Sequence, residues 1–505
     1  SSSIPCVTHN GKNSGMTDSL AAGLFRPSRL LLLINLFLAC CIILAIYFDQ
    51  YWLIALPAVF LLGFVLLRDL RFLYIIMMMS VPISIEYSIG SFTLDAPDEL
   101  LNIFFLALMP GFLLFNYKNI NFSFVRHPIV LFLAASFLLS IITTIFSVNV
   151  FLSVKYLLAK AWYIVAYFGM TALFIKSWKD VKTLAIAVGF TAVLTMVYVM
   201  SRHAVRGFSF DSINSCVGPF YSNHVNYAIQ LLVIFPLIWL LGRIHQLKWK
   251  QNYLYIALML LFIAGIYFSY TRAAIGALLL LIPFYYIVKW KLMKPAIILS
   301  IIGVFSYSIY LIKDNKFFDY APDYNKTISH TDFNTLLTAT YNFEDISTME
   351  RVYRWVAARY MIADRPMIGV GPNNFYDTYS AYTLKSFRTY VSDNPDHSTV
   401  HSYFMLLAIE QGILAPILFV WMVAWAMIAG QRMYHRETDK RNQYVIMAAM
   451  MILFAMLVVL TINDVIESDK EGSFFYVALA LIMRFHWKSI KGTDNPTSPE
   501  TGKAQ

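Results

Sequence analysis

The sequence YVIMAAMMILFAMLVVLTI, residues 444–462, places nineteen residues in a row without a single charge. A helix needs about 20 predominantly apolar residues to cross the hydrocarbon core of a bilayer. A membrane β-barrel strand would instead show a short alternating pattern. Comparable apolar runs recur along the chain from Leu30 to Phe485. The stretch therefore predicts one transmembrane helix among many.

The composition supports the same class of protein. Of the 505 residues, 59% are hydrophobic and 13% are charged, whereas a soluble domain carries about 25% charged residues. We predict an all-α polytopic membrane protein with about 12–14 transmembrane helices. The predicted spans are residues 30–47, 51–67, 72–85, 100–115, 129–146, 156–175, 183–200, 223–241, 253–270, 272–288, 296–312, 401–429, 444–462 and 474–487.

Charges on the two sides of the 444–462 run predict its orientation. The basic stretch QRMYHRETDKR (431–441) precedes the run, and the acidic stretch NDVIESDKEG (463–472) follows it. Because cytoplasmic loops are enriched in Lys and Arg, we expect the basic side to be cytoplasmic. The net charge of +10 then reflects membrane topology and does not indicate a nucleic-acid partner.

This orientation divides the chain into five predicted regions. Both termini are expected in the cytoplasm, and the one long connection is expected in the periplasm. Residues 1–15 are polar, and Met16 is a candidate natural start. The regions are a cytoplasmic tail of residues 1–29, eleven helices within 30–312, a large periplasmic loop of 313–400, the last helices within 401–487 and a cytoplasmic tail of 488–505.

The long loop carries the only sizeable soluble structure that we predict. TMERVYRWVAARYMIADRP (348–366) has helical periodicity and stops at a proline, where helices end. IGVGPNNF (368–375) is a glycine-rich turn, and YSAYTLKSFRTYV (379–391) is predicted to form a second short helix. Glycine turns can hold phosphate through backbone N–H groups, but a structural turn is the favoured interpretation here.

Several arginines fall on the predicted periplasmic side, where topology does not require them. An arginine within a span costs on the order of 2.5–3.5 kcal/mol on insertion scales, so it indicates an anionic partner or a functional pathway. Guanidinium groups suit phosphate oxygens, which favours a lipid diphosphate at the membrane interface. For Arg272 the alternative is a contact with lipid headgroups in the surrounding bilayer. The arginines that we consider are Arg206, Arg272, Arg351 and Arg354.

His401 opens the stretch HSYFMLLAIEQG (401–412) at the predicted outer end of a span. An unperturbed imidazole titrates near pH 6.5 and can accept a proton at neutral pH, although a histidine that only packs at a helix end is the alternative. Glu410 lies about 13 Å further along a continuous helix, at 1.5 Å per residue. We therefore expect Glu410 to pair with another span and not with His401.

Four stretches resemble segments of the O-antigen ligase and O-antigen polymerase superfamily. HSYFMLLAIEQG is similar to the family pattern H-[NSQ]-x9-G, and ERVYRWVAARYMIADRPMIGVGPNNF resembles R-x3-W…P-x-x-G-x-G-x-x-F. TRAAIGA (271–277) is similar to a family S-R-[AG]-[AG] signature with Thr271 in the serine position, and GPFYSNHVNYA (218–228) resembles the start of another span. The resemblance covers roughly residues 200–430.

The resemblance implies a transferase most like the lipopolysaccharide O-antigen ligase. Such an enzyme moves a preassembled glycan from undecaprenyl pyrophosphate to a lipid A-core hydroxyl at the periplasmic face of the bacterial inner membrane. It implies inversion at the anomeric carbon and no metal or other cofactor. Its implied residues are His401 as the base, Arg272, Arg351 and Arg206 on the diphosphate, and His224, His397, Ser402 and Arg354 as possible additional residues.

Four alternatives remain open at this point. An O-antigen polymerase and a protein O-oligosaccharyltransferase share the superfamily and differ in the acceptor. A flippase for lipid-linked oligosaccharides would suit fourteen spans, but polar or broken helices near the middle of the membrane would be expected. A metal-dependent glycosyltransferase would use the acidic residues Asp95, Asp98 and Glu99, which also fit the ordinary acidic bias of an outer loop.

Overall fold

The computed structural model describes residues 69–89, 92–116, 122–245, 249–322, 327, 338–342, 344–394 and 397–493. The chain divides into two compact units, Ser1–Tyr74 and Ile75–Gln505. The first unit is described only over residues 69–74, where helix α4 (Leu70–Ser80) begins. The predicted tail of residues 1–29 and the predicted spans 30–47 and 51–67 lie outside the described residues.

Helices dominate the described residues, as the hydropathy predicts. The β-structure of the described residues is one antiparallel hairpin of β1 (Ile85–Ile89) and β2 (Phe92–Ala96). After α4, the helices that precede the long loop are α5 (Asp98–Asn116), α6 (Pro128–Ile145), α7 (Val150–Tyr163), α8 (Met170–Phe174), α9 (Trp178–Val205), α10 (Ile213–Val217), α11 (His224–His245), α12 (Trp249–Tyr267), α13 (Arg272–Lys289) and α14 (Met293–Ile312). Those within and after the loop are α16 (Ile346–Asp364), α17 (Phe375–Tyr379), α18 (Tyr403–Gln411), α19 (Leu414–Arg436), α20 (Lys440–Leu460) and α21 (Asp469–Thr493).

The all-α polytopic class is confirmed. Within the described residues, eight helical segments are long and apolar enough to cross a membrane, and every predicted span in this part of the chain coincides with helical structure. The eight segments are Pro128–Ile145, Val150–Phe174, Trp178–Val205, His224–Ile244, Arg272–Lys289, Met293–Tyr320, Leu414–Arg436 and Lys440–Leu460.

The core of the second unit is built around α11, α20 and α21. In the most apolar 18-residue stretch of α11 and of α20, 72% of the residues are buried. In the corresponding stretch of the segment that contains α14, none is buried. The rings of Phe284 in α13 and Phe454 in α20 stack with centroids 4.2 Å apart. Helices such as α14 therefore present apolar side chains outward, as lipid-facing helices do.

The predicted continuous helix 401–429 is wrong, because the chain breaks at Gly412 between α18 and α19. Gly412 has φ +79, a left-handed conformation that glycine adopts without penalty. A Cβ at this position would clash with the carbonyl oxygen of Met367. The N–H of Ile413 donates to the carbonyl of Pro366 at 2.9 Å. The break between α18 and α19 therefore contacts the turn that follows α16.

The glycine-rich turn 368–375 packs against α18. Val370 and Gly371 donate backbone N–H groups to the carbonyls of Ile409 and Glu410, both at 2.9 Å. The Glu410 carboxylate accepts from the N–H groups of Asn373 (2.9 Å) and Phe375 (3.1 Å). The expectation that Glu410 pairs with another span is therefore wrong, and the N–H groups of this turn are engaged in holding the loop to α18.

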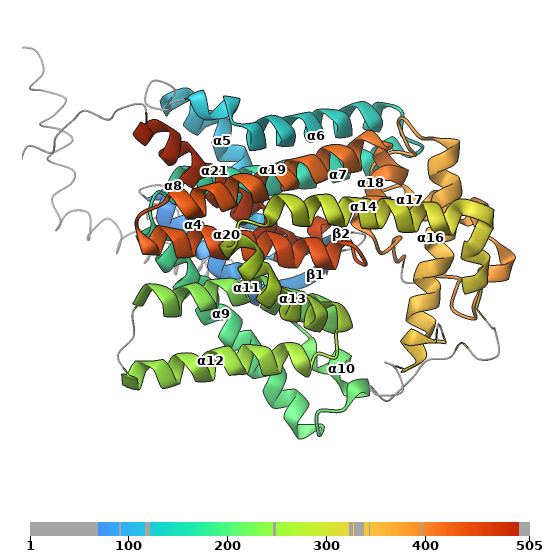
Figure 1. The fold of residues 1–505 in the computed structure, drawn as a ribbon, viewed down its shortest axis with the longest axis horizontal. Helices are drawn as coiled ribbons and strands as arrows, with labels where there is room; N and C mark the ends of the chain where they lie inside the picture. Colours follow the sequence, from blue (N-terminus) through green and yellow to red (C-terminus); the bar gives the residue numbers. More distant parts are fainter. Residues whose placement is uncertain are drawn as a thin grey trace, which may run out of the picture. The chain divides into compact units, whose positions relative to one another are not determined.

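The long loop is partly helical, as predicted. Helix α16 (Ile346–Asp364) confirms the helix expected over 348–366. The second helix expected over 379–391 is wrong: this stretch holds the end of α17 and two single 3₁₀ turns, Ser380–Tyr382 and Lys385–Phe387. Figure 1 shows α16 running across the ends of the long helices of the second unit.

Candidate functional site

Helix α16 fixes the backbone that leads into His401. The Nε1 of Trp355 donates to the carbonyl of Val400 at 3.0 Å, and Nη1 of Arg354 donates to the carbonyl of Thr399 at 3.2 Å. His401 itself has φ +51, which is uncommon for a residue with a side chain. Two consecutive carbonyls anchored to one helix therefore hold the imidazole in a conformation that the chain would rarely adopt alone.

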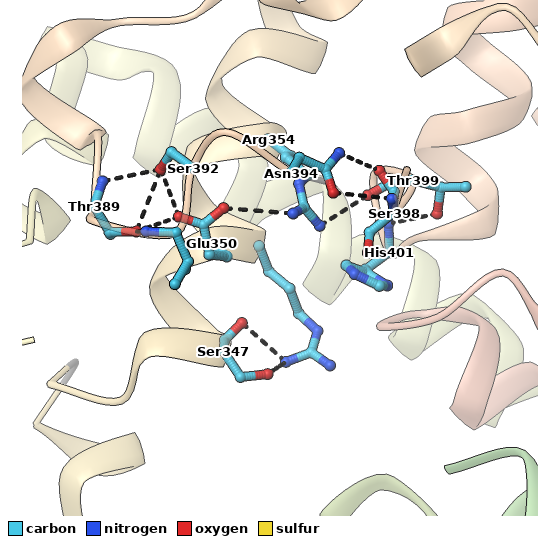
Figure 2. Close-up of polar contacts among 11 residues, drawn as sticks. Ser347, Glu350, Arg354, Thr389, Ser392, Asn394, Ser398, Thr399 and His401 are labelled. Atoms are coloured by element: carbon cyan, nitrogen blue, oxygen red, sulfur yellow. Dashed lines mark hydrogen bonds and ion pairs between the residues drawn. The ribbon is translucent and has the colours of Figure 1, made fainter. Parts of the chain in front are cut away.

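Glu350 is the centre of the hydrogen-bond network behind this anchor. Its carboxylate accepts from Nη2 of Arg354 at 3.4 Å and from the hydroxyl groups of Thr389 and Ser392 (Figure 2). Arg354 is only 5% exposed, and its Nη groups contact Glu350 and Thr399. Arg354 therefore lies beside the predicted site, where it joins α16 to the segment 389–401.

The imidazole of His401 is half-buried and its Nδ1 has no hydrogen-bond partner among the described residues. Burial, together with the positive charges of Arg351 and Arg354, lowers the pKa of His401 from 6.5 to about 3. The ring is therefore neutral at physiological pH, which is the form that can accept a proton. Figure 2 shows His401 next to Thr399, on the side of Arg354 opposite Glu350.

Arg351 carries unused hydrogen-bonding capacity at this site. Its Nη1 donates to the carbonyl and hydroxyl oxygens of Ser347 at 3.1 and 2.9 Å, and its Nε has no partner. Within the described residues, no carboxylate lies within salt-bridge distance of Arg351. Burial, followed by the neighbouring charge of Arg272, lowers the pKa of Arg351 to about 10. A guanidinium in such surroundings favours a bound anion.

Arg272, the first residue of α13, is tied to the start of α16. Its Nη2 lies 3.1 Å from Oδ2 of Asp345, and its Nη1 donates to the hydroxyl of Thr340. The same Asp345 oxygen caps α16 by accepting from the N–H of Thr348 at 3.0 Å. The Arg272 side chain remains 25% exposed, so the ion pair positions it without covering it.

His224 lies next to Arg272 because the first residues of α11 and α13 meet. The hydroxyl of Thr271 donates to the carbonyl of His224 at 3.3 Å, and Nδ1 of His224 lies 2.6 Å from the side-chain oxygen of Asn214. The structure thus places four of the predicted residues near one another, namely His224, Arg272, Arg351 and His401. Each is linked to the next by a contact or by the electrostatic effect of a neighbouring charge.

The remaining predicted residues have other surroundings. Arg206 is exposed after the end of α9, where Nη1 donates to the hydroxyl of Ser215, and nothing among the described contacts joins it to Arg351 or His401. The ring of His397 stacks on Tyr376 with centroids 3.9 Å apart. Ser402 is buried at the N-cap of α18, but its side chain makes no capping hydrogen bond.

Two acidic residues at the site were not predicted from the sequence. Asp345 pairs with Arg272, and the signal that could have revealed it is its position directly before a helix, where Asp is a favoured cap. Asp464 contacts Thr399, and burial raises its pKa while Thr399, Arg354 and Arg351 act in the opposite direction. The sequence offered no local signal for Asp464, because its acidic stretch is already explained by topology.

The donor set determines what the site can bind. Among the described residues, no group of three or more His, Cys, Asp or Glu side chains is arranged to hold a metal ion. The described guanidinium groups of Arg272 and Arg351 suit an anion, and the neutral imidazole of His401 suits a proton acceptor. The arrangement can therefore bind an anionic group beside a base.

Comparison with known proteins agrees with the sequence resemblance. Residues 257–420 match the family described as O-antigen ligase, and this segment contains Arg272, Arg351 and His401. No curated protein matches the chain. The match supports a glycosyltransferase of the ligase or polymerase type that acts on lipid-linked glycans in a membrane. With its many apolar helices, the chain is a multi-pass membrane protein, and its residues 257–420 are similar to the O-antigen ligase family.

Proposed function

We propose that the protein transfers a preassembled glycan from undecaprenyl pyrophosphate to a hydroxyl of the lipid A core. The reaction would take place at the periplasmic face of the bacterial inner membrane, with both termini in the cytoplasm. The observation that carries the proposal is the placement of Arg351, a guanidinium without a carboxylate partner among the described residues, beside both Arg272 and His401. The family match over the same segment supports it.

Arg351 and Arg272 would hold the diphosphate of the donor. As the bond between the anomeric carbon and the diphosphate oxygen breaks, negative charge grows on the leaving group, and fixed guanidinium donors stabilise such charge. Asp345 keeps Arg272 in place and leaves part of its side chain exposed to a ligand. Because undecaprenyl diphosphate leaves as an anion held by these arginines, the proposed reaction needs no metal.

His401 would act as the general base. The acceptor hydroxyl attacks the anomeric carbon from the face opposite the diphosphate, its proton passes to the imidazole, and the configuration inverts. Burial and the charges of Arg351 and Arg354 lower the pKa of His401 to about 3, whereas a base works best with a pKa near the working pH. A bound diphosphate would offset the charges of Arg351 and Arg354, so we expect the donor itself to raise this pKa.

The test is a genetic and biochemical analysis of His401→Ala in the native host. We expect polysaccharide attachment to lipid A core to be lost while lipid-linked polymer accumulates, because base help is worth about 10² to 10⁴ in rate. Normal attachment by a well-expressed variant would remove His401 as the base. Loss of the polymer itself would instead identify a polymerase, and loss of glycan from proteins would identify a protein O-oligosaccharyltransferase.

A further inference from the structure

A polar cavity lies beside the β1–β2 hairpin, and none of its lining residues belongs to the proposed diphosphate site. It has a volume of about 140 Å³ and lies between the β1–β2 hairpin, the residues around the start of α11, and the first turn of α21. We call it the hairpin cavity, and the residues of its lining used below are Glu86, Asp95, Phe220, Asn226, Asp469 and Glu471.

Lys470, which also lines the cavity, has its protons engaged elsewhere. Its Nζ donates to the carbonyls of Ser84 (3.1 Å) and Phe220 (2.6 Å) and lies 3.6 Å from Oδ2 of Asp95. An ammonium group has three donors and no acceptor. Lys470 therefore fastens β1 and the start of α11 to α21 and has no further proton for the other carboxyl groups of the lining.

Carboxyl oxygens of the lining have no hydrogen-bond donor among the described residues. Glu471 is 0% exposed, and its Oε2 accepts from the hydroxyl of Ser468 while Oε1 has no partner. Asp469 is 5% exposed, and its Oδ2 is likewise without a partner, as is Oδ1 of Asp95. Leaving a buried polar group unpaired costs about 1–3 kcal/mol. The carboxyl groups of Asp95 and Asp469 also share a hydrogen bond with each other, so the unpaired oxygen of Glu471 is the one that indicates a ligand with a donor.

The chemistry of the lining excludes two classes of ligand. Four carboxyl groups and a single lysine repel a phosphate or diphosphate, since like charges at close range are unfavourable. The described residues contain no group of three or more carboxyl or imidazole side chains arranged for a metal ion. Sugar hydroxyl groups fit, because each can both donate to a carboxyl oxygen and accept from the amide of Asn226. Phe220 adds an apolar surface for a sugar ring.

We propose that the hairpin cavity binds a sugar unit of the glycan substrate through hydroxyl groups, one of which donates to Glu471. This proposal rests on the proposed glycan transfer. It gives the protein a second point of contact with its substrate, in addition to the proposed diphosphate site. The sugar unit belongs either to the donor glycan or to the acceptor core, which share this chemistry.

The position of the cavity fits an extended substrate that also reaches His401. The N–H of Tyr403 donates to the carbonyl of Asn463 at 3.1 Å, and the chain continues from Asn463 to the cavity residues Asp469 and Glu471. On the other side, Asn226 follows His224 in the first turn of α11, and His224 contacts the residue before Arg272. Two short segments therefore connect the hairpin cavity to the proposed diphosphate site.

Binding of soluble oligosaccharides to the purified full-length protein tests the proposal. One probe is the neutral glycan released from the host's lipid-linked donor, and the other is core oligosaccharide released from its lipid A; calorimetry would measure both. We expect one probe to bind, and Glu471→Gln, which keeps the side-chain size, to weaken that binding at least tenfold. Asn226→Ala, which leaves the buried carboxyl groups intact, should also weaken it. Asp377→Asn, which alters an exposed carboxylate in α17, should leave it unchanged.

Each outcome decides a specific point. Binding of the released donor glycan assigns the cavity to the donor, and binding of the core oligosaccharide assigns it to the acceptor. Absence of binding by both probes, or equal binding by wild type and Glu471→Gln, overturns the proposal. Undecaprenyl diphosphate without sugar tests the proposed function separately: its binding should weaken in Arg351→Ala and persist in Glu471→Gln. If Arg351→Ala binds undecaprenyl diphosphate normally, the proposed diphosphate site is wrong. The result of the oligosaccharide binding experiment would remain valid.

Discussion

The indole Nε1 of Trp355 donates a hydrogen bond to the carbonyl oxygen of Val400, 3.0 Å away. Val400 is fully buried and directly precedes His401, whose backbone has φ +51. One bond from α16 therefore restrains the residue that orients the proposed base. This relationship would hold the proposed base in a defined position.

Replacing Trp355 by Phe should lower activity without preventing folding. The change keeps an aromatic ring but leaves the Val400 carbonyl unpaired, which costs about 1–3 kcal/mol for a buried group. Small displacements of a catalytic group can lower rates by up to about 10²-fold. We expect kcat to fall about 10- to 100-fold with little change in donor KM. Trp290→Phe, at an exposed tryptophan after α13, is the control, and an unchanged kcat in Trp355→Phe would contradict the positioning role.

The pH dependence of transfer should respond to the charge of Arg351. The Arg351 charge is one cause of the lowered pKa of His401, so Arg351→Gln should raise that pKa. Because the base must be neutral, activity falls as the pH drops through its pKa, and the acid limb of kcat/KM, which reports free-enzyme groups, should move to higher pH in Arg351→Gln.

Arg351→Lys separates charge from geometry at the same position. It keeps the positive charge, so the acid limb should stay at the wild-type pH. Donor KM should rise, because lysine lacks the planar fork that matches phosphate oxygens. If both variants share the wild-type acid limb, either His401 is not the titrating base or Arg351 does not act on it.

Asp345 should prove to have two separable roles, since the same carboxylate caps α16 and pairs with Arg272. Serine is also a good N-cap, whereas replacing a capping Asp, Ser or Thr by Ala costs about 0.5–2 kcal/mol. Asp345→Ala should therefore melt below Asp345→Ser. Both variants release Arg272, and both should raise donor KM, by about tenfold if the lost positioning is worth about 1.4 kcal/mol. Equal melting temperatures would argue against the cap.

Gly412→Ala should destabilise the break between α18 and α19. A Cβ there would meet the carbonyl of Met367 at φ +79, and a left-handed backbone costs of order 1–3 kcal/mol in a residue with a side chain. Gly303→Ala is the matched control in α14, where a Cβ meets nothing within 4 Å and alanine favours the helix. Thermal unfolding in detergent would compare them, and a Gly412→Ala variant as stable as wild type would refute the contact.

The membrane class, the approximate positions of the spans in the described residues and the helix α16 could all be predicted from the amino-acid sequence. These features depend on the apolar content and the periodicity of residues that are neighbours along the chain. The sequence lists all of those residues, so the features can be predicted from it. Arg272, Arg351 and His401 are proposed as site residues because they lie in stretches that resemble family segments, and their roles stay a prediction. Their chemical types indicated a diphosphate and a base.

Which side chains are already engaged, and which keep unused hydrogen-bond donors, follows from packing between segments that are distant in the sequence. Arg354 and Arg351 lie three residues apart on α16, yet Arg354 pairs with Glu350, whereas Arg351 donates to Ser347 and has no carboxylate partner among the described residues. The break at Gly412, the partners of Glu410 and the meeting of the hairpin with α21 likewise join segments far apart in sequence. A partner is fixed by packing between distant segments, and local hydropathy carries no information about that packing.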